Sequence, residues 1–128
     1  MIYIVYGSPC SGKSAYIKQH AGRNDLIVDT DAIYSAISGH DEHDYSELYQ
    51  TAMSVLREDL YNLIKARRGK WENVWVASVC RPSELLQLMD RIDADEAIYM
   101  NTPKEECLRR ANERGEPWRE RVQTWFRG

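Results

Sequence analysis

The clearest chemical signal in this chain of 128 residues is carried by residues 7–14. They read Gly-Ser-Pro-Cys-Ser-Gly-Lys-Ser and match the pattern G-x-x-x-x-G-K-S. In this pattern backbone N–H groups surround a phosphate chain, the lysine contacts the β- and γ-phosphates, and the last hydroxyl ligates Mg²⁺. An apolar run at residues 2–6 precedes the pattern and a helical segment follows it, which is the context that the pattern requires. The sequence therefore predicts a loop that binds a nucleoside triphosphate.

All eight positions of this loop are expected to contact the nucleotide. They are Gly7, Ser8, Pro9, Cys10, Ser11, Gly12, Lys13 and Ser14. Lys13 is also a candidate catalytic residue, because its charge lies where the transferred phosphate would be held. Ser14 is a candidate ligand for Mg²⁺. ATP is the expected nucleotide, since the chain has no Asn-Lys-x-Asp motif for reading guanine.

A pair of acids, Asp29 and Asp31, follows the second apolar run of the chain. Phosphoryl transfer uses one carboxylate near the acceptor hydroxyl and another near the metal ion. Two acids spaced i, i+2 at the end of a strand could supply both. We therefore expect Asp31 to be catalytic and Asp29 to help hold Mg²⁺. The competing interpretation is that Asp31 only caps the helix that follows and Asp29 is exposed to solvent.

The C-terminal segment is basic although the chain as a whole is acidic. Residues 1–60 hold 4 Lys and Arg against 9 Asp and Glu, residues 104–128 hold 7 against 5, and the net charge is −3. Arg110 and Arg114 are four residues apart and share one helical face. Both could reach the triphosphate and stabilise the charge of the transition state. A solvent-exposed basic helix is the alternative interpretation.

Strand and helix patterns alternate along the chain, with no internal repeat and no linker. Strands are expected at residues 2–6, 26–29, 74–79 and 97–100, and helices at 13–21, 32–38, 46–68, 82–91, from 103 and after 117. Asp31 and Thr102 are expected to cap two of these helices. This order predicts one α/β domain over residues 1–128, a three-layer α/β/α sandwich with a parallel sheet. Its ligand should bind at the carboxyl ends of the strands.

Composition narrows the class of protein. No apolar stretch approaches the roughly 20 residues of a membrane span, so no contact with a membrane is expected. The three cysteines, Cys10, Cys80 and Cys107, lack metal-ligand spacing and suit free thiols in a reducing cytoplasm. The negative net charge argues against a dedicated non-specific nucleic-acid binder.

The phosphate loop, the Asp29-Thr30-Asp31 segment and the arginines at 109–114 together resemble the small P-loop kinases. The acid pair is similar to that of shikimate-kinase-like enzymes, and the C-terminal part resembles phage-type polynucleotide 5′-kinases. The resemblance implies the P-loop nucleoside triphosphate hydrolase fold, a lid that carries Arg110 and Arg114, and Asp31 as the residue near the acceptor. It departs from polynucleotide kinases at Ala32, where a second acid is expected, and at residues 77–81, which contain no acid.

Two functions therefore stay open. The first is a kinase that transfers the γ-phosphate of ATP to a hydroxyl acceptor, which could be a small metabolite, a nucleoside or nucleotide, or the 5′ end of a nucleic acid. The second is an ATPase or nucleotide sensor that works with a protein partner in a phage or mobile element. The absence of an acid at residues 77–81 keeps the second function under consideration.

Overall fold

The computed structural model describes residues 1–128 and contains a four-stranded parallel sheet in the order β2-β3-β1-β4. The elements are β1 (Ile2–Tyr6), α1 (Lys13–His20), β2 (Leu26–Val28), α2 (Thr30–Ser38), η1 (Glu47–Tyr49), α3 (Gln50–Lys65), β3 (Val74–Ser78), η2 (Pro82–Glu84), α4 (Leu85–Ile92), β4 (Glu96–Tyr99), α5 (Lys104–Arg114) and α6 (Glu116–Arg127). The predicted α/β class, strand order along the chain and parallel pairing are confirmed.

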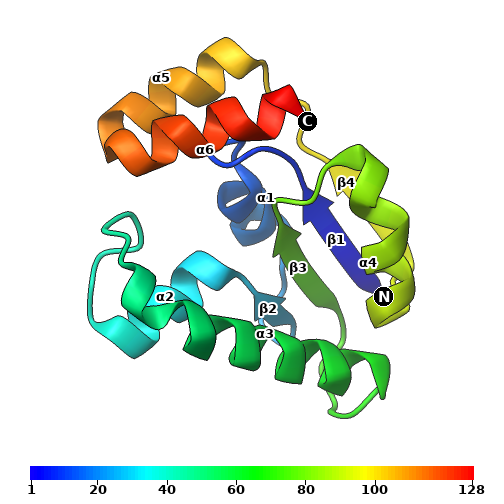
Figure 1. Ribbon diagram of the computed structural model, residues 1–128. Helices are drawn as coiled ribbons and strands as arrows, with labels where there is room; N and C mark the ends of the chain where they lie inside the picture. The colour runs from blue at the N-terminus through cyan, green and yellow to red at the C-terminus, as the bar shows by residue number, and fades with distance from the viewer.

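Helices cover both faces of the sheet, as the alternating pattern requires (Figure 1). The larger core lies between the sheet and the helices α3 and α4, and its buried members are Ile2, Ile4, Tyr6, Val28, Tyr61, Ile64, Val74, Val76 and Ile92. On the opposite face, Ile17 of α1 packs with Val5 and Trp75. Because β1 contributes to both cores, its side chains are apolar without alternation.

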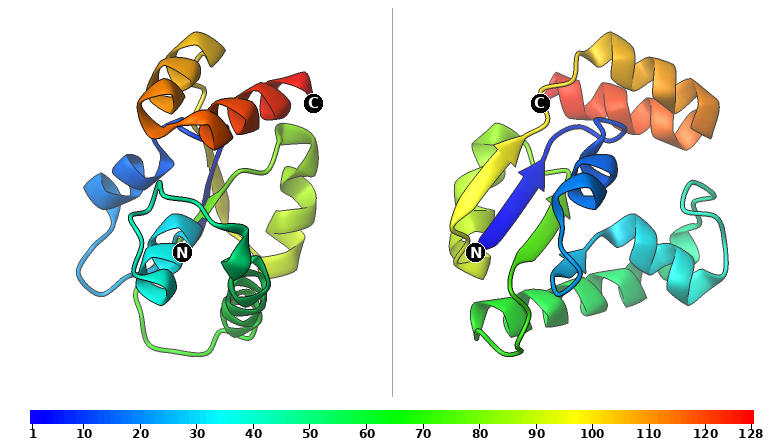
Figure 2. Two further views of the ribbon diagram at one scale, coloured as in Figure 1. Left: turned by 60° about the vertical axis from the view of Figure 1, so that its left-hand side comes forward. Right: turned by 180° about the vertical axis from the view of Figure 1, so that it is seen from behind.

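The helices α5 and α6, which we call the lid helices, pack against each other beyond the carboxyl ends of the strands (Figure 2). A third core joins them to the phosphate loop: Cys10 packs with Cys107, Ala111, Trp118 and Val122. The lid is thus held on the loop by apolar contacts as well as by polar ones. None of the helices combines the length and apolar character that crossing a membrane would require.

Two predicted helix caps are wrong, and the helices predicted over residues 46–68 and 82–91 both begin later than predicted, after the short helices η1 and η2. Asp29, not Asp31, caps α2: its carboxylate accepts the N–H of Asp31 at 3.1 Å, which places Asp31 in the first turn. Thr102 does not cap α5, because its hydroxyl donates to the Ser11 carbonyl at 2.8 Å. The helix expected over residues 46–68 runs only over Gln50–Lys65, since η1 precedes it.

Gly7 is needed where β1 enters the phosphate loop. A Cβ at this position would lie 2.9 Å from the Met100 carbonyl oxygen and 3.0 Å from Ser11 Oγ. We expect Gly7→Ala to lower the free energy of unfolding by about 1–3 kcal/mol, as overpacking does. Urea denaturation would measure this. Gly39→Ala is the control, because Gly39 also has a positive φ, of 76°, but open space around it. Equal losses in the two variants would contradict the steric argument.

Candidate active site

The phosphate loop connects β1 to α1 and leaves amide donors free for an anion. The N–H groups of Cys10 and Gly12 have no acceptor in the protein, and both residues have left-handed backbones, with φ of 65° and 98°. The carbonyls point to other partners: Thr102 donates to Ser11 and Arg110 Nη1 donates to Cys10 at 3.0 Å. With its carbonyls engaged and the N–H groups of Cys10 and Gly12 unpaired, the loop has the form of an anion-binding nest.

Lys13 folds back over the loop in this structure. Its Nζ donates to the carbonyl of Ser8 at 2.7 Å and to that of Gly7 at 3.3 Å. Burial lowers the pKa of Lys13 from 10.5 to about 8, although Asp31 and Asp29 act in the opposite direction. A buried ammonium group without a full counter-charge is poised to bind an anion.

The lowered pKa of Lys13 predicts proton uptake when ATP binds. The folded-state pKa of about 8 lies below 10.5, so the stabilising contribution of Lys13 is complete above pH 10.5 and is lost as the pH falls through about 8. A bound triphosphate favours the charged amine and raises this pKa again.

We therefore expect proton uptake on binding of Mg-ATP to be small near neutral pH and to approach one proton at about pH 9. Calorimetry in two buffers of different ionisation enthalpy measures it. Lys70→Met, which changes an exposed lysine in the connection between α3 and β3, should leave the uptake intact. Binding without proton uptake at the higher pH would contradict the assignment.

Ser14 and Asp29 lie together as the sequence predicts for a magnesium site. The Ser14 hydroxyl donates to Asp29 Oδ2 at 2.5 Å. Two hard oxygens, one at the start of α1 and one at the N-cap of α2, fit Mg²⁺, which takes one or two protein ligands and completes its octahedron with phosphates and water. No group of three or more His, Cys, Asp or Glu side chains in the structure could hold a metal ion without a nucleotide. The residues present therefore fit a metal that arrives with the nucleotide.

Asp31 lies in the first turn of α2 and faces the same cavity as Lys13. Burial raises the pKa of its carboxyl group, and the nearby charge of Asp29 raises it further. Lys13, Arg114 and His43 act against this rise. A carboxylate with a raised pKa accepts a proton more readily, which suits a general base.

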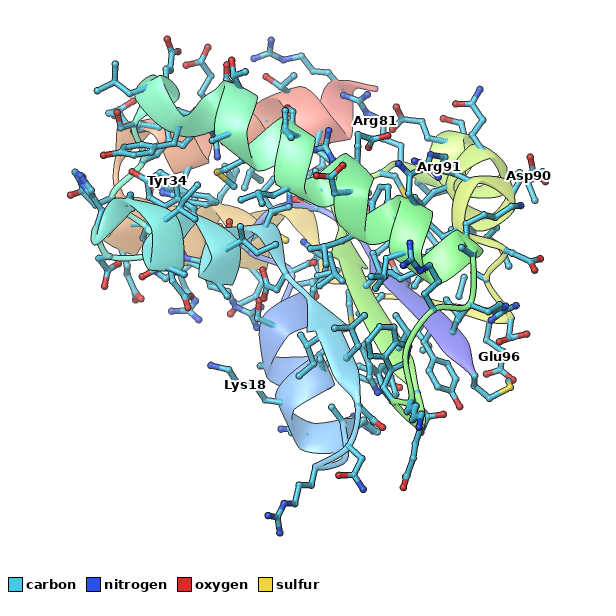
Figure 3. All side chains as sticks on the ribbon, turned by 90° about the horizontal axis from the view of Figure 1, so that it is seen from below. Lys18, Tyr34, Arg81, Asp90, Arg91 and Glu96 are labelled. Carbon is cyan, nitrogen blue, oxygen red and sulfur yellow. The ribbon has the colours of Figure 1, made fainter.

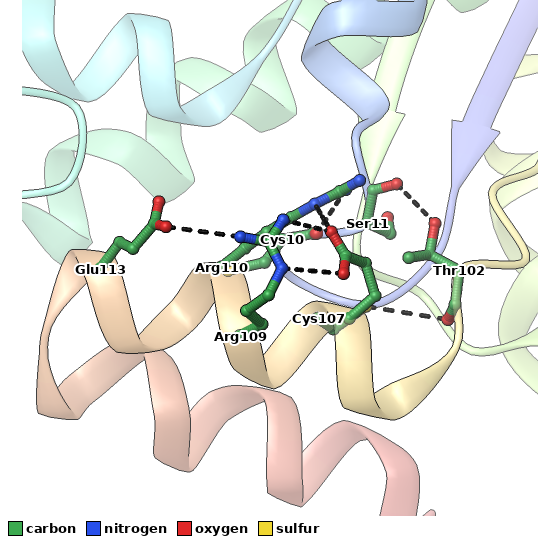
Figure 4. Close-up of polar contacts among 8 residues, drawn as sticks. Cys10, Ser11, Thr102, Cys107, Arg109, Arg110 and Glu113 are labelled. Atoms are coloured by element: carbon green, nitrogen blue, oxygen red, sulfur yellow. Dashed lines mark hydrogen bonds and ion pairs between the residues drawn. The ribbon is translucent and has the colours of Figure 1, made fainter.

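The structure separates the two arginines that the sequence groups together. Arg114 lines the cavity, with its guanidinium 5.3 Å from the centre of the Trp118 ring. Arg110 is not part of the cavity wall: it binds the Cys10 carbonyl and, at 3.1 Å, the Glu106 carboxylate (Figure 4). Arg110 thus holds the lid on the outer side of the loop. Of the two arginines that the sequence places near the triphosphate, only Arg114 lines the cavity.

Arg109 completes the polar network on the outer side of α5. It forms ion pairs with Glu106 and, at 3.4 Å, with Glu113. These contacts lower the pKa of Glu106 to about 2, with the hydrogen bond from Arg109 as the main cause. Arg109 therefore supports the lid from outside and does not face the cavity.

Two cavity residues, Arg81 and Arg121, are absent from the sequence-based site. Arg81 follows β3 and donates from Nε to the Trp125 carbonyl at 3.1 Å, so it ties the end of α6 to the sheet (Figure 3). Arg121 lies on α6 with its guanidinium 3.8 Å from the centre of the Tyr45 ring. Arg121 is seven residues beyond Arg114, but Gly115 interrupts the helix, so helical spacing could not have connected them.

One cavity of about 860 Å³ lies at the carboxyl ends of the strands, and Lys13, Ser14, Asp29, Asp31, Arg81, Arg114 and Arg121 line it, whereas Arg109 and Arg110 do not. Its walls are the phosphate loop, the Asp29–Asp31 segment, the end of β3 and the inner side of α6. A cavity of this size takes a nucleotide or a similar small molecule.

Comparison with known proteins agrees with this architecture. A family model described as an AAA domain matches residues 2–124. The chain belongs to the AAA domain family. No curated protein matches the sequence of this AAA domain.

Two solved structures share the fold of this AAA domain. A chain of the Pnkp1/Rnl/Hen1 RNA repair complex superposes with a TM-score of 0.63 and 19% identity over 98% of this chain and 45% of that one. Shikimate kinase from Acinetobacter baumannii, in complex with shikimate, gives 0.56 and 14% over 98% of this chain and 74% of the kinase. This AAA domain thus spans less than half of the RNA repair chain. The predicted resemblance to small P-loop domains with the fold of such a kinase is confirmed.

Proposed function

We propose that this AAA domain, residues 1–128, acts as one unit that transfers the γ-phosphate of ATP to a hydroxyl acceptor. The observation that carries the proposal is the single cavity lined by the phosphate loop, by Asp31 and by Arg114. Phosphoryl transfer needs a phosphate cradle, a proton acceptor and a cation near the transferred group. These three lie within one enclosure of suitable size. The resemblance to a kinase that binds the hydroxylated molecule shikimate supports the same reaction class.

In this proposal Asp31 accepts the proton of the acceptor hydroxyl. The acceptor oxygen forms a bond to the γ-phosphorus while the bond from that phosphorus to the β,γ-bridging oxygen breaks, and ADP leaves with the electron pair. Lys13 and Arg114 stabilise the charge on the transferring group. Arg110 acts indirectly, because it fixes the lid to the Cys10 carbonyl.

Ser14 and Asp29 would hold Mg²⁺ with the nucleotide, and the ion would neutralise charge on the phosphates. Asp29 has a second task, since its carboxylate also caps α2 and so positions Asp31. The same side chain therefore couples the metal site to the proton acceptor. No third protein carboxylate is needed for this arrangement.

The second candidate is an ATPase or nucleotide sensor that acts with a protein partner. One observation favours it: the end of β3 and the residue after it line the cavity with Ala77, Ser78 and Val79, and these three residues contribute no carboxylate. A partner could supply the missing acid. Such a protein would hydrolyse ATP slowly alone and would not respond to hydroxyl acceptors.

Release of ADP from Mg-ATP across an acceptor panel separates the two candidates. The panel contains hydroxylated metabolites, nucleosides, nucleotides, and DNA and RNA with 5′-hydroxyl ends. Stimulation by one class, lost in Lys13 and Asp31 variants, supports the kinase and identifies its acceptor. Tight ATP binding with slow turnover that no acceptor changes would overturn the kinase proposal and favour the partner-dependent ATPase.

A further inference from the structure

A second cavity of about 620 Å³ opens beside the first. It lies between α2, the beginning of α3 and α6, and the side chain of Tyr34 lies in the space between α2 and α3 (Figure 3). The two cavities share the wall residues Thr30, Asp31, Glu42, Trp118 and Arg121. Asp31, the proposed proton acceptor, is therefore accessible from both. A molecule in the second cavity would meet the nucleotide at this shared wall.

Arg121 is held in this shared wall by aromatic rings and not by acids. Its guanidinium lies 3.8 Å from the centre of the Tyr45 ring and 5.1 Å from that of Trp118. It makes no hydrogen bond or ion pair with the protein. Stacking fixes the plane of the guanidinium and leaves its N–H donors unused, and such donors match a carboxylate or phosphate in a bidentate manner.

The rings that hold Arg121 are themselves fixed by hydrogen bonds. Trp118 Nε1 donates to the His43 carbonyl at 2.9 Å, and the Tyr45 hydroxyl accepts from Gln50 at 2.7 Å. The position of Arg121 thus depends on the lid, on the connection after α2 and on the start of α3 together. Its geometry is set before any ligand arrives, which reduces the entropic cost of binding.

A second arginine, Arg57 of α3, lines only the second cavity. Its one ionic contact is a 3.7 Å approach to the neighbouring Glu58, and both side chains are substantially exposed. The acids of this cavity, Asp31 and Glu42, both belong to the shared wall. Both acids therefore lie at the wall that the two cavities share, together with Arg121. The second arginine, Arg57, lies in the part of the second cavity away from this wall.

We propose that the second cavity binds the acceptor, and that the acceptor is a small molecule carrying a carboxylate or phosphate group that Arg121 and Arg57 recognise. This inference rests on the proposed kinase function and specifies its substrate class. The hydroxyl group is directed to Asp31 at the shared wall while the anionic group pairs with the arginines. Arg121 is then a specificity-determining residue.

Binding, measured apart from turnover, tests the proposal. The nucleotide cavity is first filled with the magnesium complex of a non-hydrolysable ATP analogue, so that anions cannot bind the phosphate loop. Calorimetry and the NMR signals of the arginine Nε–H groups then report binding of ribose 5-phosphate, shikimate and inorganic phosphate. Ribose and the methyl ester of shikimate are the neutral counterparts. The two anionic classes separate a phosphate acceptor from a carboxylate acceptor.

We expect at least one anionic probe to shift the Arg121 Nε–H signal and to bind about tenfold more tightly than its neutral counterpart. Arg121→Met and Arg57→Met should each remove most of this preference, while Arg121→Lys should restore part of it. Arg119→Met is the control, because Arg119 lies on the same helix, is exposed and lines neither cavity.

Equal binding of neutral and anionic probes, or no binding by any of them, would overturn the inference. So would an unchanged preference in Arg121→Met. These outcomes leave the kinase proposal to its own test, since ADP release stimulated by a neutral acceptor would uphold the kinase and exclude the anionic substrate class.

Discussion

Lys13→Met is expected to abolish turnover of ATP by this AAA domain and to remove its stabilisation by nucleotide. The Lys13 ammonium is the one cation of the phosphate loop. In the structure it donates hydrogen bonds to the Ser8 and Gly7 carbonyls. Methionine keeps the length of the side chain but not its charge. Loss of a charged contact to the transferring phosphate lowers the rate by about a thousandfold. ADP release and the thermal shift induced by Mg-ATP measure the two effects.

Lys70→Met is the matched control, because Lys70 is exposed in the connection between α3 and β3. This variant should bind and turn over ATP as the parent does. Lys13→Met should itself fold normally, since removal of a buried charge with a lowered pKa relieves a desolvation cost below pH 8. Normal ATP-induced stabilisation in Lys13→Met would refute the nucleotide site as we have described it.

Asp31→Asn should reduce acceptor-dependent turnover about 10²–10⁴-fold, the contribution of a general base. Binding of ATP should persist, because the phosphate loop, Ser14 and Asp29 are unchanged. The amide has nearly the same shape as the carboxyl group and keeps the first turn of α2. Steady-state kinetics with the stimulating acceptor, together with ATP titration, separates the loss of chemistry from loss of binding.

The raised pKa of Asp31 adds a pH signature to this prediction. A carboxyl group whose folded pKa is raised stabilises the protein below its unfolded pKa of 3.8, and this contribution is lost as the pH rises through the folded value. Asp31→Asn should therefore unfold at a higher temperature than the parent at neutral pH. Turnover of the parent should rise with pH through the raised pKa, and the variant should lose this limb.

Asp59→Asn, on the exposed side of α3, should change neither turnover nor the pH profile. If Asp31→Asn retained full turnover, Asp31 would be only a residue of the first turn of α2. In the structure the capping task belongs to Asp29, which leaves the Asp31 carboxyl group free for the cavity.

The sequence predicts the fold class and the order of strands along the chain well because the relevant signals are local. Each strand is a short apolar run. Each helix is marked by the helical spacing of its apolar residues and by the residues that start and end it. The helix starts at Asp31 and Thr102 were misplaced because capping depends on which nearby carboxylate or hydroxyl is free. Asp29 caps α2 through Oδ1 while its Oδ2 accepts from Ser14, whereas the Thr102 hydroxyl donates to the Ser11 carbonyl 91 residues away.

By itself the sequence determines the phosphate loop, the Ser14–Asp29 pair and the alternation that builds a parallel sheet. The tertiary structure alone decides which arginines line the cavities. Arg110 binds the outer side of the loop, while Arg121 enters both cavities against Tyr45. The physical reason is that a loop motif is set by backbone geometry over eight consecutive residues. The direction in which a long arginine side chain points depends instead on how the lid helices pack on segments that are distant in the sequence.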